Sequence, residues 1–310
     1  MSTITINIYG VRGSSPISGP DYIEFGGNTS SYTIRTPQNT LIFLDAGTGI
    51  RLAEGELDQL ANKVIMLLSH THADHIQGFG MTRLPQLHLV EGYQNKLLQI
   101  IGPSNVGESL KRYYDGEVLW PVKFSESQSD GFPRMEGINY SSILEYSKET
   151  TKTIEIDGVT TLEMMKGNHP VRDGVMLYKF QFNTNEGIKK IVYATDNEFD
   201  FISNRRVNPE ADRLKQEYLE FIENADYLIA DAQYTYEDYQ SQFQGYGHSY
   251  HQQVIDFAAK SNVQNLILTH HHLYSDNKLN QVETSFQNYI SEKRYQISLK
   301  LAREGYKVSF

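Results

Sequence analysis

The stretch that decides the fold reads Ser69-His70-Thr71-His72-Ala73-Asp74-His75. It follows a short apolar run, Val64-Ile65-Met66-Leu67-Leu68, whose length and polar boundaries predict a buried strand. Three histidines and one aspartate are therefore expected where the chain leaves that strand. Imidazole and carboxylate groups are typical ligands of zinc and similar divalent ions. Because four such side chains so close together cannot all reach one ion easily, the spacing suggests two adjacent metals.

The alternative is a polar turn that contains histidines by chance. The chain has 10 histidines, and three of them fall within six residues here. The pattern at a strand end favours the metal interpretation. A single histidine elsewhere in the chain would not.

At 310 residues the chain could form one large α/β domain or two small ones, and nothing in it reads as a linker, a repeat or a low-complexity tract. We expect a single domain over residues 1–310. The chain has no cysteine, which excludes disulfides and thiolate ligands and fits a reducing cytoplasm. Its beginning reads as an alternating strand and not as a signal peptide, and no apolar run approaches the ~20 residues that cross a membrane. We therefore expect a cytoplasmic protein. A formal net charge of −10 argues against a long nucleic acid as substrate.

Apolar runs along the rest of the chain predict further strands, several of which end in an acidic residue or a histidine. Expected strands cover residues 4–8, 31–36, 41–44, 153–156, 159–165, 174–182, 188–193, 227–230, 266–269 and 306–310. Expected helices cover residues 50–60, a short helix from Asp74 through Gly80, 209–224, a segment through 254–258, and two more after residue 272. The residues at strand ends are Asp45, His70, His169, Asp196, Asp231 and His270. A sheet fixes such positions rigidly while its loops present the side chains.

These motifs resemble the metallo-β-lactamase-fold hydrolases. The resemblance is carried by His70 to His75, and by Gly10-Val11-Arg12-Gly13-Ser14-Ser15-Pro16, Phe25-Gly26-Gly27-Asn28-Thr29-Ser30 and Leu44-Asp45-Ala46-Gly47-Thr48-Gly49-Ile50-Arg51. It implies an α/β fold (α+β in some schemes), a four-layer αββα sandwich with two sheets back to back and helices outside. Residues 105–151 are less regular. They either help to cover the active site or form a surface excursion.

The resemblance also implies a set of metal ligands. The first metal would be held by His70, His72 and His169, the second by Asp74, His75 and His270, and Asp196 would bridge the two. Asp45 would stand behind a ligand histidine and fix its tautomer. His271 and His272 compete with His270, which is preferred because it directly follows the strand.

A second motif, Gly247-His248-Ser249, is similar to ribonuclease Z and related phosphodiesterases. In those enzymes this histidine contacts the scissile phosphate and protonates the leaving oxygen, with support from an earlier acid. That acid stands in a His-Glu-Ala-Thr segment, which here reads Ala230-Asp231-Ala232-Gln233, so the acid survives as Asp231 but its flanking histidine does not. The alternative for His248 is a histidine in a helix-capping turn.

The expected function is hydrolysis of a small phosphodiester, above all a cyclic nucleotide, with two divalent metals as cofactors, preferably zinc and otherwise manganese or iron. Asp74, His248 and Asp231 would be catalytic, with Asp74 accepting the proton of the attacking water. The alternatives are a lactonase or thioesterase of the same fold, a tRNA-processing ribonuclease, and a non-catalytic binder that sequesters a nucleotide. The expected partners are the small substrate and a second copy of the chain in a homodimer, with no membrane and no long nucleic acid.

Overall fold

The chain divides into two compact units, each built on one seven-stranded sheet. The computed structural model describes residues 3–121, 123–124, 138–146, 151–172, 174–200, 202–203, 206–207 and 211–309. Unit 1 consists of Met1–Gly10, Asn28–Lys148 and Glu304–Phe310, and unit 2 consists of Val11–Gly27 and Glu149–Arg303. The single domain expected over residues 1–310 stays a prediction.

Unit 1 carries the first sheet, in the order β16-β1-β2-β3-β4-β5-β6. Strands β16, β1, β2 and β3 pair antiparallel, and β3 to β6 pair parallel. The strands are β1 Thr5–Gly10, β2 Ser31–Arg35, β3 Thr40–Leu44, β4 Lys63–Leu67, β5 Leu98–Pro103, β6 Ile138–Tyr146 and β16 Lys307–Ser309. The helices are α1 Ile50–Ala53, α2 Ala73–Ile76 and α3 Val106–Tyr113, with 3₁₀ turns at Glu54–Asp58, Phe79–Met81 and Leu84–Leu89.

The register of two parallel strands positions the first functional segment. Leu44 at the end of β3 lies opposite Leu67 at the end of β4, so both strands stop at the same sheet edge. β3 is buried along its whole length and β4 is buried from Val64 onward, which agrees with their apolar sequences. Asp45 and the segment that starts at Ser69 therefore leave the sheet side by side.

Unit 2 carries the second sheet, in the order β15-β14-β13-β10-β9-β8-β7. Strands β7 to β10 pair antiparallel, and β10, β13, β14 and β15 pair parallel. These strands are β7 Thr151–Glu155, β8 Thr160–Gly167, β9 Val175–Thr184, β10 Gly187–Ala194, β13 Tyr227–Asp231, β14 Asn265–Thr269 and β15 Ser298–Leu301. The two-residue strands β11 Ile202–Ser203 and β12 Arg206–Val207 form a separate small sheet.

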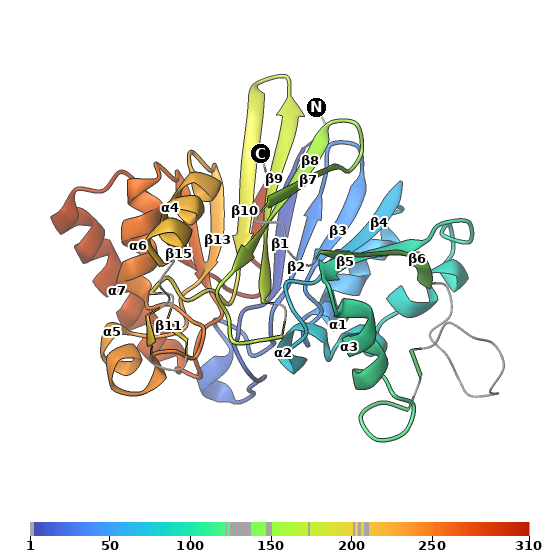
Figure 1. Cartoon of the computed structure of the whole chain (residues 1–310), viewed down its shortest axis with the longest axis horizontal. Coiled ribbons are helices and arrows are strands. Elements are labelled where there is room, and N and C mark those ends of the chain that lie inside the picture. The colour runs from blue at the N-terminus through green and yellow to red at the C-terminus, as the bar shows by residue number, and fades with distance from the viewer. Residues whose placement is uncertain are drawn as a thin grey trace. The chain divides into compact units, whose positions relative to one another are not determined.

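Three amphipathic helices accompany the parallel part of this sheet. They are α4 Ala211–Ile222, α6 His251–Lys260 and α7 Asp276–Lys293, and Figure 1 shows them beside β13 and β15. Leu228 of β13 and Leu266 of β14 share a buried apolar cluster with Val254 of α6 and Phe286 of α7. Shorter turns lie at Pro20–Tyr22, at α5 Tyr236–Asp238 and at a π-helical turn, Tyr239–Phe243.

The ends of the three parallel strands again share one edge. Ala194 pairs with Ala230, and Asp231 pairs with Thr269, so Asp196, Asp231 and His270 all lie at or just after the carboxyl ends of adjacent strands. This arrangement is the usual place for a site in an open α/β sheet.

Most predicted elements are confirmed, including the hairpin β9–β10, but two predictions are wrong. The helix expected over residues 50–60 is only α1, because Glu54–Asp58, which includes Gly55, is a 3₁₀ turn. In place of a second helix after residue 272, α7 is followed by β15, whose burial alternates between exposed Ser298 and buried Leu299. Residues 125–137 and 147–150 of the less regular segment lie outside the described residues. In the described part of the chain, no helix has the length and apolar character needed to span a bilayer.

Candidate metal centre

In unit 1, the carboxylate of Asp45 orients the buried ring of His75 through a hydrogen bond. Asp45 accepts hydrogen bonds from the Ser69 backbone nitrogen (2.7 Å), the Ser69 hydroxyl (2.9 Å) and His75 Nδ1 (2.8 Å). Asp45 and His75 are both fully buried. The expected contact of Asp45 with a candidate ligand histidine is therefore present, and its role at a metal site stays a prediction. Because the Nδ1 proton goes to Asp45, the neutral His75 ring carries its lone pair on Nε2.

The remaining ligand candidates of unit 1 gather around this ring. His75 Nε2 lies 3.3 Å from a carboxylate oxygen of Asp74, the neighbouring residue on α2. His70 Nε2 lies 3.0 Å from His72 Nδ1, and the centroids of the His70 and His75 rings are 4.2 Å apart. Two ring nitrogens at such a distance share either a proton or a cation.

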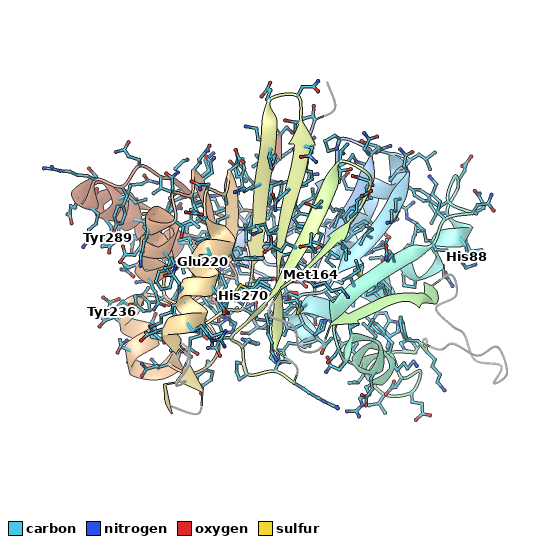
Figure 2. The ribbon with its side chains drawn as sticks, turned by 45° about the horizontal axis from the view of Figure 1, so that its top comes forward. His88, Met164, Glu220, Tyr236, His270 and Tyr289 are labelled. Carbon is cyan, nitrogen blue, oxygen red and sulfur yellow. The ribbon has the colours of Figure 1, made fainter. Side chains whose placement is uncertain are left out.

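Unit 2 fixes His169 in a similar way. His169 Nδ1 donates to the Gly247 carbonyl at 2.9 Å, which leaves the lone pair on Nε2. That Nε2 lies 3.7 Å from a carboxylate oxygen of Asp196. His270 Nε2 approaches the other oxygen of Asp196 to 3.2 Å. Figure 2 labels His270, together with Glu220 on α4 and Tyr289 on α7 of the same unit.

The backbone is strained at three of these strand ends. Asp45, Asp196 and His270 have φ angles of 57°, 48° and 60°. These values lie in the left-handed region, which residues other than glycine rarely adopt. Such conformations cost of order 1–3 kcal/mol each and persist where the surroundings impose them. Two of these residues are ligand candidates and Asp45 contacts a third, His75, which favours a functional explanation.

The donor chemistry fits divalent metals. In both units an imidazole Nε2 with a lone pair faces a carboxylate oxygen, at His75 with Asp74 and at His169 with Asp196. A lone pair and an anion repel each other unless a cation or proton lies between them. Within unit 2, the ligand atoms of His169, Asp196 and His248 lie within 4.8 Å of one another. Nitrogen and oxygen ligands of this kind suit zinc and related ions.

His248 lies against these ligands and is held by Asp231. Its Nδ1 donates to Asp231 Oδ2 at 2.9 Å, and the same oxygen accepts the Asn197 backbone nitrogen at 3.3 Å. The His248 ring stacks on the His270 ring, with centroids 4.9 Å apart. Burial raises the pKa of the Asp231 carboxyl, while the adjacent His248 opposes that shift. The expected contact between His248 and Asp231 is present, and its catalytic role stays a prediction.

The structure separates the three consecutive histidines. His271 is buried and donates from Nε2 to the Ala302 carbonyl at 3.0 Å, so this nitrogen is engaged with the backbone. His272 is half-buried among the rings of Tyr234 and Phe243. Within unit 2, His270 is the one of the three that approaches Asp196, which agrees with the choice made from its position after the strand.

The glycine turn of residues 10–16 supports His270 closely. A Cβ atom on Gly13 would lie 2.4 Å from His270 Nδ1, so only glycine fits there. The fully buried Arg12 donates from Nε to the Gly26 carbonyl (2.7 Å) and from Nη1 to the Tyr274 carbonyl (2.7 Å). From the sequence, this turn contributes to the family resemblance, but no role was predicted for its residues.

A cluster of aromatic rings extends from His248 to the surface. The Tyr234 ring meets His248 edge-on, with centroids 5.9 Å apart, and stacks on Phe243 at 4.3 Å. Phe243 in turn contacts the ring of Tyr246, which is 59% exposed. Such faces suit a planar ring of a ligand.

A family model described as "Beta-lactamase superfamily domain" matches residues 40–271. The chain belongs to the β-lactamase superfamily. The matched residues include the ligand candidates of both units. This superfamily assignment, with two mixed sheets and their helices, confirms the predicted α/β sandwich of the metallo-β-lactamase type. No curated protein matches the sequence.

Three solved structures illustrate the superfamily's fold. The metallo-β-lactamase-fold protein YhfI from Bacillus subtilis is 16% identical, with 100% of both chains covered and a TM-score of 0.64. Yeast PDE1 is 15% identical, with 99% of both chains covered and a TM-score of 0.65. The short form of human tRNase Z is 16% identical, with 98% of both chains covered and a TM-score of 0.59. The resemblance stated from the sequence is confirmed at the level of superfamily and fold.

Proposed function

We propose that the chain is a metal-dependent phosphodiesterase. The proposal rests on one observation above all, the hydrogen bond from His248 to the buried Asp231 beside the ligand candidates Asp196 and His270. A histidine held in this way suits proton donation to a leaving oxygen. Hydrolysis of a lactone or thioester by the same metals has no evident use for that pair.

The proposed metal ligands are the set that the sequence resemblance implies. They are His70, His72, Asp74, His75, His169, Asp196 and His270, with Asp196 bridging, and zinc is the preferred ion. The superfamily model covers all of them, and the tautomers of His75 and His169 support coordination through Nε2. When bound, two divalent ions supply Lewis acidity toward a phosphoryl oxygen and lower the pKa of water.

The protein's own residues would then direct the protons. Asp74 accepts a proton from the attacking water, and His248 donates one from its Nε2 to the departing alkoxide. Asp231 accepts the Nδ1 hydrogen bond, so it fixes the direction of the ring and stabilises the protonated form. Asp231 is the last residue of β13, and Asp196 and His270 follow β10 and β14 closely, so the rigid sheet keeps these groups in place.

The proposed substrate is a cyclic nucleotide, converted to its monophosphate. In ribonuclease Z, which the Gly247-His248-Ser249 motif resembles, an arm that grips transfer RNA is inserted between the third ligand segment and the bridging aspartate. Here the hairpin β9–β10 fills that interval, between His169 and Asp196. The net charge of −10 does not favour a polynucleotide. The ring cluster of Tyr234, Phe243 and Tyr246 offers faces for one base.

A substrate panel tests the proposal. Metal-loaded protein is incubated with 3′,5′-cyclic mononucleotides, cyclic dinucleotides, precursor transfer RNA, a lactone and a thioester. The expected result is turnover of a cyclic nucleotide, abolished in Asp196→Ala. Turnover of transfer RNA alone would contradict the substrate, and turnover of the lactone or thioester alone would contradict phosphodiester chemistry.

A further inference from the structure

Glu198 is a fully buried carboxylate that none of the proposed catalytic steps uses. It lies two residues after Asp196, in the loop that follows β10. Its Oε1 accepts hydrogen bonds from the Tyr239 hydroxyl and the Gly245 backbone nitrogen, both at 2.7 Å. Its Oε2 accepts the Gly247 backbone nitrogen at 2.9 Å. A buried carboxylate with three such donors is held firmly, and it holds its donors equally firmly.

These donors belong to the turn that precedes His248. Gly245 and Gly247 have φ angles of 86° and 90°, a conformation that leaves both of their N–H groups directed at Glu198. A Cβ atom on Gly247 would lie 2.2 Å from His169 Nδ1, so any side chain at this position would collide with His169. The Gly247 carbonyl is the acceptor that fixes the His169 tautomer.

The other side of His248 is fastened to the same loop. The Ser249 hydroxyl donates to the Asn197 carbonyl at 2.7 Å and accepts the Phe199 backbone nitrogen at 3.0 Å. His248 therefore stands between two attachments to residues 197–199, with Glu198 on the glycine side and Ser249 on the helix side.

We propose that Glu198 is a positioning residue that, through the Gly245–Gly247 turn, sets the orientation of both His169 and His248. The proposal deepens the proposed function and rests on it for the roles of these two histidines. Glu198 itself is fully buried and is not one of the proposed metal ligands. A single carboxylate would thus couple a metal ligand to the proton donor.

The competing explanation is that Glu198 only stabilises the fold. Three variants separate the two. Glu198→Gln keeps the shape but places an amide N–H₂ group where one of the three donors needs an acceptor. Tyr239→Phe removes one donor and leaves both backbone contacts intact. Asp256→Asn is the matched control, since this half-buried carboxylate on α6 also accepts two tyrosine hydroxyls, from Tyr289 (2.9 Å) and Tyr295 (3.0 Å).

Three readouts are compared at equal folded fraction. They are zinc affinity by competition with a chelating dye, the imidazole N–H signal of His169 in NMR spectra, and the rate ratio between an alkyl and a nitrophenyl phosphodiester. For Glu198→Gln we expect zinc affinity to fall roughly 10- to 100-fold, as for other residues that orient a metal ligand. The His169 signal should shift, and the alkyl diester should lose more rate than the nitrophenyl diester, which needs little protonation. Tyr239→Phe should show the same changes, but smaller.

The outcomes decide between the explanations. If Glu198→Gln and Tyr239→Phe lower only the thermal midpoint, as Asp256→Asn does, the positioning role is refuted. If Glu198→Gln does not fold, Tyr239→Phe alone tests the proposal, through its zinc affinity and the imidazole N–H signal of His169. If the wild-type protein hydrolyses no phosphodiester, the proposed function fails, while zinc affinity and the His169 signal still report on the orientation of His169.

Discussion

Replacement of Asp231 by Asn tests the proton donor without changing its shape. Asp231 is 1% exposed, and its Oδ2 accepts both His248 Nδ1 and the Asn197 backbone nitrogen. An Asn carbonyl oxygen in the same place can still accept both hydrogen bonds. The variant therefore removes the negative charge and leaves the geometry.

The expected loss follows from that charge. Hydrogen bonds to charged groups contribute about 1.5–3 kcal/mol, against about 0.5–1.5 kcal/mol for neutral pairs. The difference, about 1–2 kcal/mol, corresponds to a fall of roughly 5- to 30-fold in kcat at 1.36 kcal/mol per tenfold. The loss should apply in full to a substrate that leaves as an alkoxide. It should shrink for a nitrophenyl ester, whose leaving group needs little protonation.

The assay is steady-state kinetics of metal-loaded protein with both kinds of diester, alongside metal analysis of each preparation. Asp226→Asn is the control, because Asp226 is a half-buried carboxylate next to β13 that accepts the Lys190 backbone nitrogen at 2.8 Å. Equal losses for the two substrates would refute the role of Asp231 in proton donation. A fall in metal content that matches the fall in rate would assign Asp231 to metal binding instead.

Four further changes have defined outcomes. His248→Ala should keep its metal and lose roughly 10²–10⁴ in rate on an alkyl diester, and a collapse of metal content would make His248 a ligand. Asp196→Ala should bind fewer than the two metal equivalents expected of the wild type, measured by elemental analysis, and a wild type that stays at one equivalent would contradict the bridge. Gly13→Ala should weaken metal binding in a chelator titration, because the new Cβ would lie 2.4 Å from His270 Nδ1, and unchanged affinity would show that the turn yields. Burial lowers the pKa of His251 to about 3, so protonation of this residue favours the unfolded state. Between pH 7 and pH 5 the free energy of unfolding, measured by urea titration, should therefore fall by about 2 kcal/mol more in the wild type than in His251→Leu. Equal falls in the two proteins would show that other groups cause the acid sensitivity.

The sequence predicts the strand ends well because their physical basis is local. A short apolar run followed by Asp45, Asp196 or His270 marks a buried strand and the residue that leaves it. The parallel pairing of β3 with β4, and of β10 with β13 and β14, then brings such residues to common edges. The hydrogen bond between His248 and Asp231 was expected only through the resemblance, since 17 residues separate them in the chain.

The supporting residues could not be predicted, because their partners are backbone groups far away in the sequence. Glu198 binds two N–H groups of a turn 47 and 49 residues later, and no residue pattern encodes that contact. Arg12 binds the Tyr274 carbonyl, 262 residues away. An acidic residue directly after Asp196-Asn197, and two glycines before His248, were the available signals, but each is also typical of an ordinary loop.

The pairing of β1 with β16 has a consequence for how the protein is made. Thr5 lies opposite Ser309, 304 residues away, and β1 has β2 as its other neighbour. A ribosome must therefore synthesise Lys307–Ser309 before the first strand gains its second partner. Until then, the nascent chain presents an open strand edge on which other chains could add. Unit 1 can complete its sheet only after translation has passed through the whole of unit 2.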